Sequence, residues 1–443
     1  MGVSAFGSDV NLEVGEVLEL GVEENIIKKV EETAAKAEQF RKFGDAVAQK
    51  IVIRKPYVTG IKGLDGATAR MWKRLRQAAM LLIKKMATAT PIVIRFHNDI
   101  DGASCAYALH KAMQQVLEGN GTLCKEQNVL WRMHYGVSYG VDDASNDLLI
   151  CNDYESAEKP LLIILDFGTS PESNAGLEQV NDKFEIIWLD HHTPVPEFRG
   201  NKLEHYINPW DFGSDSSYTA GALTCAFVKS FADIETRDIE NASFIGDYST
   251  YANPNEQSRR LASILDVLTC DPKLVGARSL EPKTIEKIVN DKTAGDELIA
   301  YAGNRISETL DSALSSVKSY AEGTIYVADF EDIRGFSKER YPLPGRFASM
   351  LLTKLEEVRG KGCTVVLHFG PYISVRTSKL LPKKVSSEEK DLLKTLESIR
   401  KEYPELIDSA GGHANAASIK LRGEENKEIV IKALLEGLKN DER

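Results

Sequence analysis

Short hydrophobic runs alternate with helical patterns from Pro91 onward. The runs that predict buried strands are Ile92–Phe96, Leu148–Cys151, Leu161–Leu165, Glu185–Leu189 and Leu203–Ile207. The stretches with helical spacing of apolar residues are Ala103–Leu117, Pro171–Asn181, Tyr218–Phe231 and Asn255–Val267. Continuous apolar strands that alternate with helices are typical of a mostly parallel sheet covered by helices on both faces. The predicted fold class of this part of the chain is therefore α/β.

A second, smaller α/β pattern begins near Gly323. Its predicted strands are Thr324–Ala328, Cys363–His368, Tyr372–Arg376 and Ala416–Leu421, and its predicted helices are Gly345–Val358, Ser386–Glu402 and a last helix from Glu424. Between the two patterns, Asp271–Ser319 predicts connecting helices. We therefore expect a helical N-terminal region over residues 1–88, a first α/β domain over 89–270, connecting helices over 271–320 and a second α/β domain over 321–443.

The residues before Pro91 predict two amphipathic helices, Val22–Gln49 and Thr68–Met86. Three glycines lie between or near them, and we expect a loop there, because no strand precedes them and no phosphate-loop Lys-Ser/Thr follows; they are Gly60, Gly63 and Gly66. The second helix carries a basic face made of Arg70, Lys73, Arg74, Arg76, Lys84 and Lys85. Such a face is most often solvated, and contact with a phosphate backbone is the less common alternative.

The composition sets outer limits on function. A chain of 443 residues suggests two or three domains, and 42% hydrophobic with 27% charged residues is ordinary for a soluble protein. The formal charge of −11 argues against a general nucleic-acid coat, although it is compatible with a local basic groove. Six scattered cysteines without a C-x-x-C pair fit reduced thiols. Without a membrane-length apolar run or a signal-like N-terminus, we expect a cytoplasmic protein with no membrane partner.

Polar side chains capable of binding metal follow the first predicted strand. His97, Asp99 and Asp101 stand at alternate positions after Ile92–Phe96 and before Gly102. On an extended backbone, residues at alternate positions share one face, so we expect one imidazole and two carboxylates to point into the same space. Carboxylates this close repel each other unless a cation lies between them. The alternative is a solvated acidic turn before a helix, where Asp is favoured in any case.

Three more predicted strand ends repeat this pattern. The residues that follow these predicted strands are Asp166, the triplet Asp190-His191-His192, and Asp247. Each residue alone could be a helix cap or a turn residue, but their joint occurrence after apolar runs is difficult to explain by capping. Clusters of Asp and His without Cys suit Mn²⁺ or Mg²⁺ better than structural zinc.

The second α/β pattern carries a different chemistry. Ser374, Arg376 and Ser378 alternate along one predicted strand, and the sequence Gly411-Gly412-His413 follows near the end of the chain. Paired glycines let backbone N–H groups approach an anion, and His and Arg add donors, so phosphate binding is the functional interpretation. The alternative for each piece is a glycine turn with a capping His and an Arg in a surface ion pair.

Together, H-N-D-I-D-G at 97–102, Asp166, D-H-H at 190–192, Asp247 and G-G-H at 411–413 resemble the DHH phosphoesterase superfamily with its DHH-associated C-terminal domain. The resemblance spans about Ile92 to Leu421, and within the superfamily it is greatest to archaeal RecJ-like single-strand exonucleases. That group is also related to a catalytically inactive cofactor of the eukaryotic replicative helicase. Every metal motif is intact here, which disfavours the inactive branch. A C-terminal domain of the oligonucleotide-binding type, which bacterial RecJ carries, has no counterpart in this sequence.

The resemblance implies a site with two divalent cations, Mn²⁺ preferred and Mg²⁺ as the alternative. Asp166 would bridge both cations, His97 and Asp99 would hold one, and Asp101, His191 and Asp247 would hold the other. Asp190 would orient His191, and His192 would face the scissile phosphate. Arg376, Gly412 and His413 would grip a substrate phosphate, with Ser374, Ser378 and Gly411 beside them. Arg346 would join them, unless it is simply a surface arginine at a helix start.

Three functions follow as expectations. The first is a Mn²⁺-dependent exonuclease that hydrolyses single-stranded DNA or RNA by direct attack of activated water, in replication or repair. The second is a phosphoesterase for very short oligonucleotides, pAp or cyclic dinucleotides. The third is a replication scaffold that binds GINS and the replicative helicase, with nuclease activity secondary. Polarity, substrate length and the preference for DNA or RNA stay open at the level of sequence.

Overall fold

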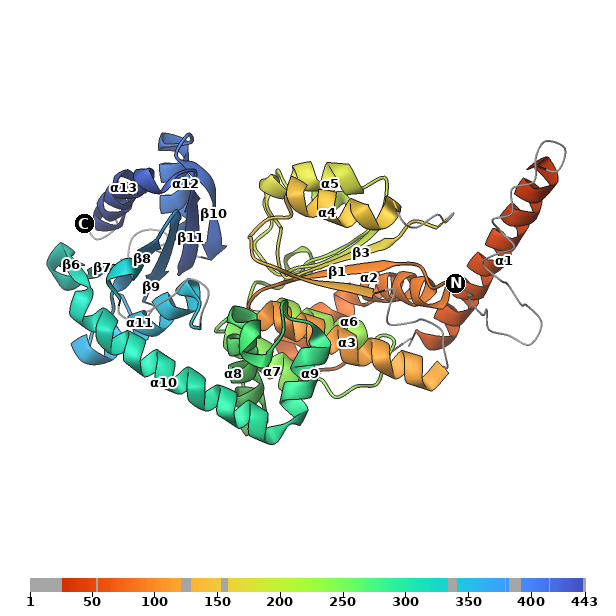
Figure 1. Cartoon of the computed structure of the whole chain (residues 1–443), viewed down its shortest axis with the longest axis horizontal. Helices are drawn as coiled ribbons and strands as arrows, with labels where there is room; N and C mark the ends of the chain where they lie inside the picture. The colour runs from red at the N-terminus through yellow and green to blue at the C-terminus, as the bar shows by residue number, and fades with distance from the viewer. Residues whose placement is uncertain are drawn as a thin grey trace. The chain divides into compact units, whose positions relative to one another are not determined.

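The computed structural model describes residues 26–52, 55–120, 129–152, 158–333, 341–378, 380–381, 392–413 and 415–440. The chain forms two compact units. The first comprises Met1–Ala262 with Ser279–Glu286, and the second comprises Ser263–Arg278 with Lys287–Arg443. Each unit has its own sheet with helices on both faces, so the predicted α/β fold class is confirmed (Figure 1). None of the described helices combines the length and the apolar character that a membrane crossing requires.

The first unit is built on a parallel five-stranded sheet with the order β2-β1-β3-β4-β5. The strands are β1 (Ile92–His97), β2 (Val129–His134), β3 (Leu161–Leu165), β4 (Glu185–Leu189) and β5 (His205–Ile207). Strands β1, β3 and β4 are buried almost throughout, which explains their uninterrupted apolar sequences. Because all five strands run in the same direction, their carboxyl ends meet at one edge of the sheet.

Helices cover both faces of this sheet (Figure 1). On one face lie α4 (Val141–Asn152) and α5 (Asn174–Val180), packed over a core that includes Trp188. On the other face lie α3 (Ile100–Asn120) and α6 (Ala220–Val228), with α7 (Arg237–Gly246) packed against both. The helices α8 (Glu256–Cys270) and α9 (Pro282–Asn290) follow α7 in the chain.

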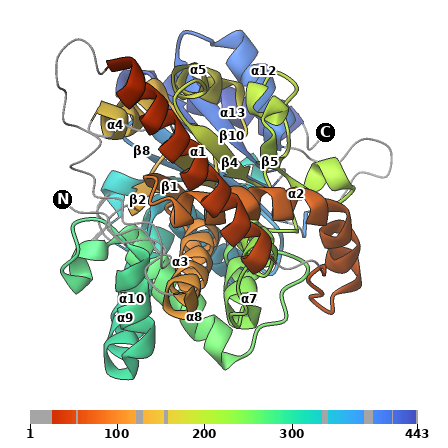
Figure 2. The same cartoon turned by 90° about the vertical axis from the view of Figure 1, so that its right-hand side faces the viewer.

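The N-terminal helices belong to this unit. The helix α1 (Ile26–Ile51) packs along α2 (Lys62–Ala87), as Figures 1 and 2 both show. The fully buried ammonium of Lys85 lies 2.8 Å from Glu158, and Arg41 of α1 lies 2.7 Å from the same carboxylate. Buried charges persist only when they are paired, so Glu158 fixes both helices to the sheet.

Several sequence predictions are wrong in this unit. Leu148–Cys151 lies in α4 and is not a strand, because a short apolar run fits a buried helix face equally well. The missing strand is β2, an edge strand on which Leu130 is 39% exposed, so its sequence lacks the continuous apolar run. Asp247 follows helix α7 rather than a strand. Gly63 and Gly66 lie inside α2 rather than in a loop, and a Cβ on Gly63 would lie 2.5 Å from the hydroxyl oxygen of Tyr251.

The second unit contains a six-stranded sheet with the order β10-β11-β9-β8-β7-β6. The strands are β6 (Lys318–Tyr320), β7 (Ile325–Asp329), β8 (Thr364–Phe369), β9 (Tyr372–Thr377), β10 (Ile407–His413) and β11 (Ala416–Leu421). Among these described strands, β7 and β8 pair in parallel and the other neighbours are antiparallel. The sequence did not predict β6 or β10, the two edge strands.

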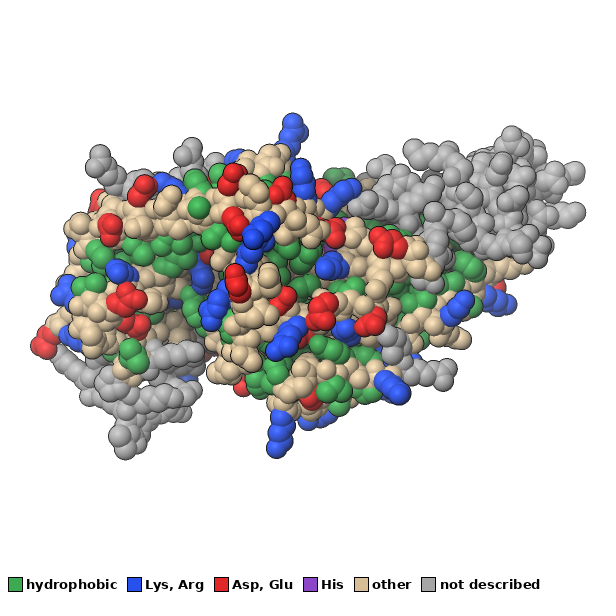
Figure 3. Space-filling model, turned by 90° about the horizontal axis from the view of Figure 1, so that it is seen from below, with side chains coloured by type: hydrophobic (Ala, Val, Ile, Leu, Met, Phe, Trp, Pro, Cys, Tyr) green, Lys and Arg blue, Asp and Glu red, His purple; other side chains and the backbone are tan. Residues whose placement is uncertain are grey.

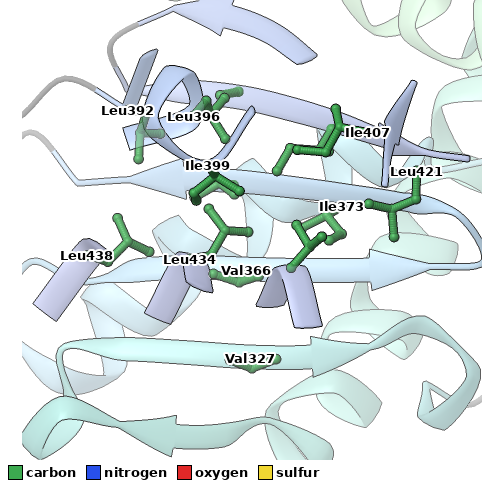
Figure 4. Close-up of a cluster of buried hydrophobic side chains, with 14 of the residues drawn as sticks. Val327, Val366, Ile373, Leu392, Leu396, Ile399, Ile407, Leu421, Leu434 and Leu438 are labelled. Atoms are coloured by element: carbon green, nitrogen blue, oxygen red, sulfur yellow. The ribbon is translucent and has the colours of Figure 1, made fainter. Parts of the chain in front are cut away.

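Each face of the second sheet has its own core. On one face, α12 (Leu392–Glu402) and α13 (Lys427–Asn440) pack over Val366, Ile373 and their neighbours (Figure 4). On the other face, α11 (Pro344–Arg359) packs over Val365 and Leu367, with α10 (Lys292–Ser316) beside it. Alternate residues of β8 therefore serve opposite cores, as the pleat of a strand requires.

Candidate metal centre and phosphate-binding groups

Asp166 lies at the centre of the polar edge of the first sheet. It follows β3 directly, and its backbone has a φ of 68°, a left-handed conformation that is rare for a residue other than glycine. Both of its carboxylate oxygens are buried and accept no hydrogen bond. An unpaired buried carboxylate is strongly unfavourable unless a cation or a proton compensates it. This orphaned carboxylate fits a site for metal ions.

His97 and Asp99 form one side of the cluster. The Nδ1 atom of His97 lies 2.7 Å from Oδ2 of Asp99 and 3.8 Å from Oδ2 of Asp166. The other oxygen of Asp99 accepts a hydrogen bond from the backbone N–H of Gly102 at 2.9 Å. A Cβ on Gly102 would lie 2.3 Å from the carbonyl oxygen of His97, so glycine is needed for α3 to begin this close to β1.

Asp101 reaches the cluster by a different route from the one predicted. It lies in the first turn of α3, so it does not continue the alternation of the strand. Its carboxylate accepts hydrogen bonds from the backbone N–H groups of Ala220 (2.8 Å) and Gly221 (2.7 Å) at the start of α6, and from the hydroxyl of Ser243. Its Oδ2 lies 3.6 Å from Nε2 of His191. Asp101 therefore joins α3, α6 and α7 beneath the cluster.

His191 and Asp247 form the other side. Nε2 of His191 lies 3.4 Å from Oδ1 of Asp166 and 3.1 Å from Oδ2 of Asp247. Nδ1 of His191 lies 2.9 Å from the carbonyl oxygen of Ser216. Because a carbonyl can only accept, this contact places the proton of a neutral ring on Nδ1 and leaves Nε2 for a cation.

Asp190 acts mainly on the neighbouring histidine. Its Oδ1 lies 2.8 Å from Nδ1 of His192 and accepts the backbone N–H of His191 at 2.8 Å. Its Oδ2 accepts from the backbone N–H and the hydroxyl of Thr169. The ring of His191 is thus oriented by Ser216, and Asp190 holds the ring of His192, which corrects the predicted role of Asp190.

The donor atoms form three overlapping groups in which all members lie within 4.8 Å of one another. The groups are His97 with Asp99 and Asp166, Asp101 with His191 and Asp247, and Asp166 with His191 and His192. Within the described residues, these are the groups of three such side chains close enough to share an ion. The first two are the sets expected for two cations, and Asp166 lies next to both.

The electrostatics of the cluster favour added positive charge. Burial, followed by the charges of Asp101 and Asp99, raises the pKa of Asp166 well above its usual range. Burial and the charge of Asp247 raise the pKa of Asp101 to about 7. Burial lowers the pKa of His191, but its contacts with Asp166 and Asp247 outweigh this and raise that pKa well above the usual range. A bound cation would reduce the repulsion among these carboxylates.

Sequence reasoning missed the side chains that support these groups. Thr169, Ser216 and Ser243 each contact a predicted donor or its neighbour through the bonds described above. Ser243 had a readable signal, because it lies four residues before Asp247 on the same helix face. Ser216 contributes its backbone carbonyl, which every residue has, so the type of residue at this position gives no signal in the sequence.

In the second unit, strand register aligns the predicted phosphate-binding residues. In one row across β9, β11 and β10, Ser374 pairs with Ser418 and Ser418 with Gly411. In the next row of this kind, Arg376 pairs with Ala416 and Ala416 with His413. The backbones of the two motifs are thus neighbours in one sheet. The side chain of His413 lies outside the described residues, as do Lys379, Lys383 and Lys384.

Ser374 and Arg376 lie beside the first turn of α11. Arg376 donates through Nε to the hydroxyl of Ser349 (3.1 Å) and through Nη1 to the carbonyl of Ala417 (3.2 Å). A Cβ on Gly345, in the first turn, would lie 3.0 Å from Nη2 of Arg376 and 4.0 Å from Oγ of Ser374. The buried hydroxyl of Ser374 has no hydrogen-bond partner.

Other predicted contacts have structural partners instead. Nε of Arg346 lies 3.2 Å from Asp266 of α8, and that carboxylate also accepts from the hydroxyl of Tyr341 at 2.9 Å. The hydroxyl of Ser378 accepts the backbone N–H of Leu380 at 2.9 Å and so closes the turn after β9. In the structure, Arg346 therefore forms an ion pair with Asp266, and Ser378 stabilises a turn.

The basic face of α2 also has intramolecular partners. Nε of Arg70 donates to the carbonyl of Phe212, and Nη1 of Arg74 donates to the carbonyl of Tyr206 at 3.4 Å. The guanidinium of Arg74 also lies 5.3 Å from the centre of the Phe212 ring. These arginines contact β5 and the segment that follows it. The solvated or structural interpretation of this helix face therefore fits better than contact with phosphates.

Part of the chain matches a known protein family, and most of the chain aligns with a known relative. The family model named DHH family, N-terminal domain, matches residues 91–247. A protein of Methanocaldococcus jannaschii described as uncharacterized is 23% identical over 425 residues, an alignment that covers 84% of this chain and 54% of the relative. The chain thus spans about half the length of that curated relative.

Solved structures resemble the chain over most of its length. A DHH domain, described as that of a member of a ribosomal protein family, superposes with a TM-score of 0.76 at 19% identity, covering 92% of this chain and 99% of that one. The exonuclease RecJ bound to manganese has a TM-score of 0.50 at 17% identity, covering 83% and 94%. RecJ from Thermus thermophilus in complex with Mn²⁺ has a TM-score of 0.50 at 15% identity, covering 90% and 60%. At these identities the likeness shows the fold.

Proposed function

We propose that this chain, a member of the RecJ-like DHH superfamily, is a phosphodiesterase that uses two divalent cations to hydrolyse single-stranded DNA or RNA from an end. The observation that carries the proposal is the Asp166 carboxylate, which is buried without a hydrogen bond between His97 with Asp99 and His191 with Asp247. The RecJ structures solved with manganese support Mn²⁺ as the preferred cation.

Each side chain has a role that its contacts support. His97 and Asp99 would hold one cation, His191 with Asp247 and Asp101 the other, and Asp166 would face both. When bound, the two cations would activate the attacking water and stabilise charge on the phosphate oxygens. Asp190 holds the ring of His192 through Nδ1, and this partly exposed ring would face a phosphate of the substrate.

The second unit would bind a substrate phosphate through its own donors. Arg376 and the unpartnered hydroxyl of Ser374 offer donors in one place, beside the first turn of α11. The open backbone of Gly411, which has nothing within 4 Å of its Cβ position, lies two strands from Ser374 in the same row. His413 is proposed as a further donor on sequence grounds alone.

The test is the pair Asp166→Asn and Asp182→Asn. Asp166→Asn keeps the size of the side chain but removes its charge, so hydrolysis of an end-labelled single strand should fall by about 10³-fold or more with Mn²⁺. Calorimetric titration of Mn²⁺ into the metal-free variant should show weaker binding. Asp182 is exposed and precedes the amino end of β4, so Asp182→Asn should match the wild type. Wild-type turnover by Asp166→Asn at saturating Mn²⁺ would refute the proposal.

A second candidate is a phosphodiesterase for very short oligonucleotides. The observation in its favour is that, within the described residues, the candidate phosphate site of the second unit has Arg376 as its cationic side chain, while Arg346 is paired with Asp266. A single cationic contact can bind a short substrate as well as a long one. A ladder assay decides between them: a long end-labelled strand degraded stepwise supports the exonuclease, and turnover confined to dinucleotides supports this alternative. Binding to GINS stays a prediction.

A further inference from the structure

The second unit contains a pocket that has no part in the proposed hydrolysis. It has a volume of about 260 Å³ and lies between the sheet and α13. His368 and Asp329, at the carboxyl ends of the parallel strands β8 and β7, are paired in register and line it. Ligands of α/β sheets characteristically bind at the carboxyl ends of parallel strands.

His368 brings an unused polar atom into this pocket. The residue is 8% exposed, and its buried Nδ1 has no hydrogen-bond partner. Oδ2 of Asp329 lies 3.6 Å from this Nδ1, too far for a hydrogen bond, and 3.8 Å from Nζ of Lys427. Oδ1 of Asp329 is already used by the backbone N–H of Glu331 at 3.0 Å. An imidazole nitrogen and a carboxylate oxygen therefore face the same gap, and both can accept from a ligand.

The remaining walls define the shape and charge of the ligand. Val327 and Leu435 provide apolar surface, and Tyr320 adds an aromatic ring. The exposed rim carries Lys318 and Lys432, which suit an anionic group, and also the carboxylates of Asp332 and Glu428. Three acidic or imidazole donors do not come within 4.8 Å of one another here, so the pocket is not a metal site within the described residues.

We propose that this pocket binds a nucleoside monophosphate, with the base inside and the phosphate at the lysine rim. The base is flat and apolar on its faces, and its edge carries N–H donors for Nδ1 of His368 and Oδ2 of Asp329. Guanine presents two adjacent donors, N1–H and the exocyclic amine, so GMP is the expected preferred ligand. Uracil has one donor flanked by acceptors and should bind poorly. A nucleoside monophosphate is also what exonucleolytic cleavage releases, and a role in sensing product would rest on the proposed function.

The experiment is calorimetric titration of GMP, AMP, CMP and UMP into the full chain, kept free of metal with EDTA. The wild type should bind one GMP, with a dissociation constant at least tenfold lower than for UMP. His368→Phe should weaken GMP binding tenfold or more. Lys432→Glu, an exposed change on α13, should do the same without affecting folding, and Lys401→Glu on α12 is the matched control that should match the wild type.

Two results would overturn the proposal. One is the absence of binding by all four nucleotides at millimolar concentration. The other is GMP binding that survives in both His368→Phe and Lys432→Glu but is lost in Asp166→Asn, which would locate the nucleotide at the candidate metal centre. Because the titration contains no metal and measures no hydrolysis, its outcome is independent of whether the proposed nuclease activity is correct.

Discussion

Asp166 combines a left-handed backbone, full burial and a carboxyl group without a hydrogen bond in a single residue. Each feature is unfavourable for folding by itself, and a strained backbone of this kind costs on the order of 1–3 kcal/mol. Unfavourable features of this kind occur together at functional sites, where they are kept for function and not for stability. The stability of the metal-free protein should therefore report on this carboxylate directly.

Asp166→Asn is expected to stabilise the metal-free protein at neutral and alkaline pH. The folded-state pKa of Asp166 is raised well above its value in an unfolded chain, so the folded protein resists losing this proton. The penalty is absent below the unfolded pKa of about 3.9 and grows as the pH rises from there toward the folded pKa. The melting temperature of the variant minus that of the wild type should thus increase from pH 4 upward.

Thermal unfolding in EDTA over a pH series measures this difference. Asp182→Asn, an exposed aspartate, is the control and should give a difference that does not change with pH. Saturating Mn²⁺ should reverse the order of the two proteins, because the cation stabilises the wild-type carboxylate by mass action. A variant less stable than the wild type at every pH without metal would contradict the assignment of a buried, uncompensated charge.

The residues of the candidate site were easier to predict than the geometry that unites them. The motifs named His97, Asp99 and Asp166, and the structure brings their donor atoms together. The reasoning for Asp101 and Asp247 was wrong, since Asp101 lies in a helix and Asp247 follows one, and neither stands at a strand end. A polar residue after an apolar run is a candidate metal ligand, but this pattern does not predict whether the residue lies on a strand or on a helix.

At the scale of elements, buried central strands were predictable and edges were not. Ile92–Phe96 and Leu161–Leu165 are apolar because both faces of β1 and β3 are covered. The strands β2, β6 and β10 lie at sheet edges, with partly exposed or glycine-rich sequences that have no strand signal. The helix α4 was mistaken for a strand over Leu148–Cys151 because four apolar residues in a row carry no period.

The two glycines of the C-terminal motif should behave differently when replaced. Gly412 has a φ of 140°, and a Cβ there would lie 2.3 Å from the carbonyl oxygen of Ala416. Gly412→Ala therefore forces β10 away from β11, and we expect it to lower the free energy of unfolding by about 1–3 kcal/mol. Thermal unfolding followed by circular dichroism measures the loss.

Gly411→Ala is the matched control, because the Cβ position of Gly411 has nothing within 4 Å. Its effect on stability should stay within about 0.5 kcal/mol. If a substrate phosphate approaches this open backbone, however, Gly411→Ala should raise KM for the single-stranded substrate at unchanged melting temperature. Equal destabilisation by the two substitutions would show that the strand geometry assigned to Gly412 is wrong.

At the scale of the whole molecule, the charge of −11 must be reconciled with a polyanionic substrate. On the face shown in Figure 3, Lys and Arg side chains are interspersed with Asp, Glu and hydrophobic side chains and form no continuous basic track among the described residues. Arg70 and Arg74 of α2 are bound to backbone carbonyls of their own unit. We therefore expect binding of the proposed substrate to depend on a few strong contacts, namely the proposed cations and Arg376, rather than on a broad basic surface.

This arrangement predicts a shallow dependence of substrate binding on salt. Each phosphate contacted on a single strand contributes a slope of about −0.7 to the logarithm of affinity against the logarithm of salt concentration, so roughly two to three contacts give about −1.4 to −2.1. The dependence of kcat/KM for a single-stranded substrate on salt, at fixed saturating Mn²⁺, measures it. Arg376→Gln should make the slope shallower by about 0.7, because one phosphate contact is lost. A slope steeper than about −4 would instead require an extended basic surface.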